Sequence, residues 1–103
     1  MSSNVTLEFG QNTAISDTTA EVIDATSPPT DAIAVKIKAH PSNTGIIYVG
    51  LTGVTASTGY PLSAGETYIE IGDYKNRIDA STLFAISSVD GEDVSFVWTT
   101  VAQ

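Results

Sequence analysis

Short segments in which apolar and polar residues alternate recur along this chain, and turn-forming residues separate them. The clearest spans residues 33–39, where Val35 and Ile37 alternate with Lys36 and Lys38. Successive side chains of a β-strand point to opposite faces, so this alternation predicts a strand with one apolar and one polar face. Because no segment shows a convincing helical period, we predict an all-β protein.

Six segments carry a clear strand pattern, and one or two weaker ones accompany them. The clear segments are residues 5–9, 33–39, 46–51, 67–71, 83–88 and 94–101, and a weak one lies within residues 19–25. Turn signals separate them at intervals of roughly 8–15 residues. This pattern is typical of two packed antiparallel sheets, so we predict a jelly-roll or immunoglobulin-like β-sandwich of about 6–8 strands.

The first predicted strand is expected to contribute side chains to the core. Val5, Leu7 and Phe9 alternate with polar residues, which predicts that they share one buried face. The polar, glycine-containing residues 10–12 are expected to end this strand.

The last third of the chain predicts a hairpin and a buried tryptophan. Asp90-Gly91 stands between the segments 83–88 and 94–101, and Gly tolerates the left-handed backbone that a tight hairpin turn requires. We expect Trp98 to lie in the core, with its indole N–H reaching a backbone carbonyl or a water.

The middle of the chain predicts a central strand followed by a turn. Residues 46–51 are apolar on both sides, which is typical of a strand that is either central in its sheet or covered on both faces. We expect this strand to run antiparallel to residues 33–39. In the turn at residues 61–66, Gly65 can supply a positive φ.

Length and composition predict one domain over residues 1–103. Apolar residues make up 42% of the chain, and it contains no Cys, so a hydrophobic core has to hold it without disulfides. Residues 11–32 form either an extended arm on a neighbouring subunit or a long loop; extended structure is favoured over a short helix at 18–23. The first residues have no signal-peptide pattern, and we expect no membrane span.

Acidic residues outnumber basic ones by 12 to 4, which gives a formal net charge of −8. Nucleic-acid binding needs clustered Lys and Arg, so this balance argues against it and favours a neutral or basic partner surface. Lys36 and Lys38 nevertheless carry half of the positive charge on one strand face. They predict either docking onto an acidic partner or a solvated face paired with an acidic residue such as Glu70.

Catalytic groups are hard to find in this sequence. His40 is the single histidine, and no nucleophile or partner accompanies it in a known pattern, so we read it as an exposed strand-end residue. Asp90, Glu92 and Asp93 supply oxygen ligands that Ca²⁺ accepts, but they lack the spacing of a calcium loop and are typical of an acidic turn. We predict no catalytic, cofactor-binding or metal-binding residue and no enzymatic activity.

Three stretches resemble small virion proteins of tailed bacteriophages that are encoded with the head genes. They are VKIKAHPSNTGIIYVGL, STGYPLSAGETYIEI and LFAISSVDGEDVSFVW, all between residues 33 and 98. The resemblance implies a capsid decoration (cement) protein with a sandwich or jelly-roll fold. It further implies that the major capsid protein is the partner, that the chain forms a homo-oligomer, with a trimer favoured, and that it reaches the outer capsid surface after synthesis in the bacterial cytoplasm.

We expect the contacts with a partner to come from exposed apolar, basic and aromatic side chains. Residues 2–32, 52–60 and 73–80 are candidate contact segments. The candidate interface residues are Val5, Leu7, Phe9, Lys36, Lys38, Tyr60 and Tyr74. A head-fibre, neck or tail component, or a module that binds a saccharide or receptor, is the alternative to a decoration protein.

Overall fold

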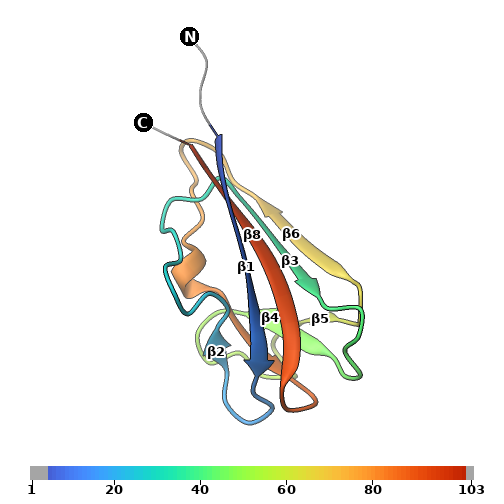
Figure 1. The fold of residues 1–103 in the computed structure, drawn as a ribbon. Helices are drawn as coiled ribbons and strands as arrows, with labels where there is room; N and C mark the ends of the chain where they lie inside the picture. The colour runs from blue at the N-terminus through green and yellow to red at the C-terminus, as the bar shows by residue number, and fades with distance from the viewer. Residues whose placement is uncertain (1–4, 102–103) are drawn as a thin grey trace.

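Two four-stranded antiparallel sheets pack against each other in this protein (Figure 1). The structure is a computed structural model that describes residues 5–101. The first sheet consists, in spatial order, of β1 (Val5–Ile15), β8 (Glu92–Val101), β3 (Ala34–Ala39) and β6 (Thr67–Ile71). The second consists of β2 (Glu21–Val22), β7 (Phe84–Ser87), β4 (Ile47–Gly50) and β5 (Tyr60–Leu62). The predicted all-β sandwich is therefore confirmed.

The strand order is that of a jelly roll. β1 pairs with β8, β2 with β7, β3 with β6 and β4 with β5, so the chain behaves like one long hairpin wrapped around the core. Successive pairs alternate between the two sheets. In an immunoglobulin-like fold the first two strands are neighbours in one sheet, whereas here β1 and β2 belong to different sheets.

Alternating side chains of β3 and β8 form the centre of the core. Val35 pairs with Trp98 and Ile37 with Phe96, and all four side chains are buried. The rings of Phe96 and Trp98 stack with centroids 4.7 Å apart. The predicted burial of Trp98 is confirmed, since its exposed fraction is 0%.

The first strand differs from the prediction in both length and facing. β1 continues through residues 10–12 to Ile15, because β8 offers a ladder partner as far as Glu92. Val5, Leu7 and Phe9 are exposed, so the expectation that they are buried is wrong. The other face of β1 carries polar and small residues. Gly10 and Asn12 are half-buried there, and Glu8, which lies opposite Trp98, is exposed.

Two turns connect strands of different sheets rather than neighbours of one ladder. The turn before β4 leads from β3 in the first sheet to the second sheet, and the Asp90-Gly91 turn leads from β7 back to β8. The predicted hairpin between the last two strands is therefore wrong, although Gly91 and Gly65 do have positive φ, as expected. β4 is central in its sheet, between β7 and β5, as predicted.

Residues 16–33 follow the body of the domain instead of projecting from it. β2 pairs with β7, and the buried Ile23 donates its backbone N–H to the Leu83 carbonyl. The neighbouring Asp24 carboxylate accepts a 2.8 Å hydrogen bond from the indole of Trp98, so the expected carbonyl or water partner of that indole is replaced by a side chain.

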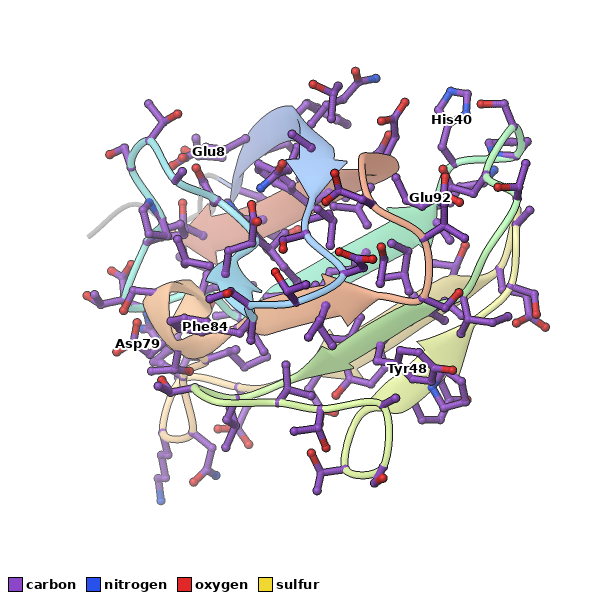
Figure 2. All side chains as sticks on the ribbon, turned by 90° about the horizontal axis from the view of Figure 1, so that it is seen from below. Glu8, His40, Tyr48, Asp79, Phe84 and Glu92 are labelled. Carbon is purple, nitrogen blue, oxygen red and sulfur yellow. The ribbon has the colours of Figure 1, made fainter. Side chains whose placement is uncertain are left out.

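One short 3₁₀ turn, η1 (Ala80–Thr82), precedes β7 and is capped by the Asp79 side chain (Figure 2). Asp79 accepts from the backbone N–H of Ser81, which satisfies a donor at the start of the turn. Within residues 5–101, no helix is long and apolar enough to cross a lipid bilayer.

Candidate interaction surface

The face of the first sheet that points away from the second sheet forms the most extensive candidate site. Directly opposed residues of an antiparallel ladder share a face, so the register assigns three rows to it. We call these twelve positions the outer sheet face. The rows are Leu7–Thr99–Ala34–Ile71, Phe9–Val97–Lys36–Ile69 and Gln11–Ser95–Lys38–Thr67.

Large apolar side chains lie on both edges of the outer sheet face. Leu7 and Phe9 on β1 are 53% and 76% exposed, and Ile69 and Ile71 on β6 are 54% and 74% exposed. Three strand spacings separate the two edges, or about 14 Å. Four exposed large apolar side chains on one sheet face exceed the scattered single residues of an ordinary surface and indicate a contact site.

The charge of the outer sheet face is opposite to that of the whole chain. Its twelve positions contain Lys36 and Lys38 and no carboxylate, although the chain carries a net charge of −8. Asp93 is two residues before Ser95 on β8, so it lies on the same face just beyond the last row. The net charge predicted a neutral or basic partner, whereas the local charge favours an acidic one.

Five of the seven candidate interface residues lie together on this side of the sheet. Leu7, Phe9, Lys36 and Lys38 belong to the rows, and Val5 continues the first strand opposite Val101. Tyr60 and Tyr74 lie elsewhere, on β5 of the other sheet and in the loop after β6.

The sequence reasoning missed the apolar edge on β6. The alternation in residues 67–71 places Ile69 and Ile71 on one face, but only the pairing with β3 shows that this face is the one that carries the lysines. The same register contradicts the expected pairing of the lysines with Glu70. Lys36 lies opposite Ile69, whereas Glu70 lies opposite Val35 on the core side.

Glu70 instead binds its neighbour on β6. Its carboxylate accepts a 2.8 Å hydrogen bond from the Tyr68 hydroxyl. Burial, together with this hydrogen bond and the adjacent negative charge, raises the pKa of Tyr68 to about 12. The Tyr68 ring also packs on Tyr60, with centroids 5.5 Å apart.

Tyr60 and Tyr74 belong to two separate surface features. Tyr60 lines a shallow groove of about 350 Å³ with Pro61, Leu62, Glu66 and Thr67. Tyr74 is in the loop after β6, where the Arg77 guanidinium lies 5.5 Å from its ring centroid.

The loop that holds Tyr74 is built on Asp73. Backbone N–H groups of Asn76 and Lys75 donate to the Asp73 carboxylate and hold its pKa below the usual range. This turn fixes the backbone position of Tyr74, which is 63% exposed.

A cleft of about 560 Å³ borders the free edge of β1. Residues 8–13 form one wall and residues 23–27 the other. Its polar groups mostly bind one another, as when the Asn12 amide donates to the Ile23 carbonyl and the Asp24 carboxylate accepts from the backbone N–H groups of Thr26 and Ser27. We therefore find no polar constellation here that is set for a ligand.

The acidic residues at the start of β8 have a structural role. Glu92 is buried, and one of its carboxylate oxygens accepts hydrogen bonds from the backbone N–H groups of Thr44 and Gly45, at 2.9 and 2.7 Å. Figure 2 shows Glu92 and His40 on the same side of the molecule. The His40 ring binds Ser42 within its own turn, with 2.8 Å between Nδ1 and Oγ.

Across residues 5–101, no three His, Asp or Glu side chains come close enough together to hold a metal ion. Comparison of the chain with protein-family models, with curated proteins and with solved structures found no match.

Proposed function

We propose that this protein is a structural component of a tailed-bacteriophage virion that binds the outer capsid surface and stabilises the shell. The observation that carries the proposal is the outer sheet face, which joins exposed apolar edges to two lysines. Its support also includes the resemblance to small phage virion proteins and the jelly-roll order, a fold that recurs in viral capsid proteins. Because one fold serves many functions, the fold contributes less to the proposal than the surface does.

The partner in this proposal is an apolar patch of the major capsid protein bordered by carboxylates. Burying Leu7, Phe9, Ile69 and Ile71 would supply most of the binding free energy, since removing apolar surface from water stabilises a complex. Lys36 and Lys38 would fix the orientation and speed the encounter. A protein that binds only the assembled shell stabilises that shell by mass action.

Co-sedimentation with capsids tests this proposal. The wild-type chain is expected to pellet with shells until lattice-like stoichiometry is reached. Lys36→Glu places a carboxylate against acidic groups of the partner, so we expect its affinity to fall by about a hundredfold. Lys75→Glu makes the same change in net charge in the loop after β6. The proposed contact is the outer sheet face and not residues 73–80, so this variant is expected to bind like the wild type. A soluble wild-type chain that stays in the supernatant would contradict the proposal.

The copy number in purified virions separates decoration from a place in the head fibre, neck or tail. A decoration protein is expected in hundreds of copies and a neck or tail part in roughly a dozen, because each follows the symmetry of its site.

The groove beside Tyr60 favours one second candidate, a saccharide-binding module. Tyr60 is 57% exposed and packs on Tyr68, so it offers a supported aromatic platform beside Glu66. Binding to a glycan array that Tyr60→Ala abolishes and Tyr74→Ala preserves would support this candidate.

A further inference from the structure

The free edge of β1 differs from the other three sheet edges. β2 has two residues, β5 has three and contains Pro61, and β6 has five. β1 has eleven residues with neither proline nor lysine, and Glu8 is its one charged residue. Short edge strands, prolines and lysines are the usual devices against strand addition, and β1 has none of them.

Backbone N–H and C=O groups along the free edge of β1 are available for pairing. In the described part of the chain, β8 pairs with one edge of β1, and no strand pairs with the other edge. An edge strand presents unpaired N–H and C=O groups on its other side. The cleft between residues 8–13 and 23–27 begins at Glu8, and residues 5–7 do not line it, so residues 23–27 stand across from the later part of β1 only.

We propose that β1 pairs edge to edge with β1 of a second copy of this chain, antiparallel, about a twofold axis at Leu7. This register places Val5 beside Phe9 of the second copy and Leu7 beside Leu7 of the second copy. On the core side it places Thr6 beside Glu8 of the second copy. The two first sheets then form one continuous eight-stranded sheet, and the proposal stands independently of the capsid-binding function.

The side-chain chemistry of β1 favours this register. All outer pairs are apolar, and cross-strand apolar pairs stabilise an antiparallel ladder. A twofold axis at Glu8 would instead set two carboxylates directly opposite each other, which destabilises a pair. The same five residues serve both copies, as an isologous contact requires.

Charge favours edge pairing over packing of two outer sheet faces. Face-to-face packing would bring Lys36 and Lys38 of both copies into one interface. In the edge-paired dimer, β8 separates the lysines of β3 from the new contact, by about 10 Å in each copy. The trimer expected from the resemblance would need a heterologous contact, which self-complementary β1 edges do not provide.

Cysteine cross-linking tests the register, because the chain contains no Cys of its own. Leu7→Cys is expected to give a covalent dimer under mild oxidation, since directly opposed Cβ atoms lie about 4.5–5.5 Å apart, close to the span of a disulfide. In the Phe9→Cys variant, each thiol lies beside Val5 of the second copy, four residues from the other thiol. In the Ile71→Cys variant, the thiol lies on the opposite edge of the sheet. Both are expected to stay monomeric on denaturing gels, and equal cross-linking of all three would overturn the proposal.

Sedimentation analysis over a range of concentrations tests the dimer without cross-linking. Pairing along five residues buries a small area, so we expect a concentration-dependent shift from 10.7 kDa to twice that mass. Leu7→Lys sets two like charges opposite each other and is expected to raise the dimer dissociation constant by about tenfold or more. Leu51→Lys, at an exposed leucine outside β1, is expected to leave the dissociation constant unchanged. A wild-type chain that stays monomeric at about millimolar concentration, or forms a trimer, would overturn the proposal.

Discussion

Asp24 and Trp98 lie 74 residues apart in sequence, and a hydrogen bond joins their side chains in the core. One carboxylate oxygen accepts from the indole, and the other accepts from the backbone N–H groups of Thr26 and Ser27. The sequence identified Trp98 as a core residue because of the alternation in its strand. It could not identify Asp24, because an acidic residue in a Thr- and Ser-rich segment carries no periodic signal.

Replacing Asp24 tests this contact. Asp24→Asn keeps one acceptor and turns an amide donor toward either the indole N–H or the backbone N–H groups, so one buried donor loses its partner. We expect unfolding to become easier by about 1–3 kcal/mol. Urea denaturation followed by Trp98 fluorescence measures the change, and Asp17→Asn, at an exposed position, is the control. Equal stabilities of the two variants would contradict the contact.

Because of Tyr68, the stability of the folded chain depends on pH in the alkaline range. Its pKa in the folded chain is about 12, above the ordinary value of 10.0, so folding favours the protonated form. That contribution to stability is complete below pH 10 and is lost as the pH rises toward 12. We expect Tyr68→Phe to remove this alkaline loss and the late tyrosinate absorbance change, whereas Tyr74→Phe keeps both. An unchanged late transition in Tyr68→Phe would refute the assignment.

Among the strands, alternation located the elements but could not orient them. It found β3 and β6 to within one residue, because a period of two needs only local sequence. It placed Val5, Leu7 and Phe9 on one face correctly, yet it could not say whether that face meets the core. The pairing with β8 supplies that information, because it sets Gly10 against the buried Phe96 and so turns Val5, Leu7 and Phe9 to the opposite face.

Gly10 explains how β1 runs past the expected break. It lies opposite Phe96, and a Cβ on Gly10 would come within 2.5 Å of the ring. Gly10→Ala must therefore displace the buried ring, at a cost of about 1–3 kcal/mol. Thermal or urea unfolding measures the loss, and Gln11→Ala on the exposed side of the same strand is expected to change stability little. A Gly10→Ala variant as stable as the wild type would show that β1 does not pack on Phe96.

At the scale of the whole molecule, the jelly-roll connection decides which residues meet on a surface. Leu7 and Ile71 are 64 residues apart in the sequence, and two intervening strands set them in one row. The sequence proposed Lys36 and Lys38 for an interface because they share a strand face. The sequence alone could not add Ile69 and Ile71 to that interface, because their place depends on which strand lies beside β3.

Lysine footprinting tests the proposed contact between the outer sheet face and the capsid. The chain has three lysines, of which Lys36 and Lys38 lie on the face and Lys75 lies in the loop after β6. Acylation of free and capsid-bound protein, read by mass spectrometry, compares all three in one sample. We predict that Lys36 and Lys38 lose most of their reactivity on the capsid while Lys75 keeps its own. Undiminished acylation of Lys36 and Lys38 in the bound protein would contradict the claim.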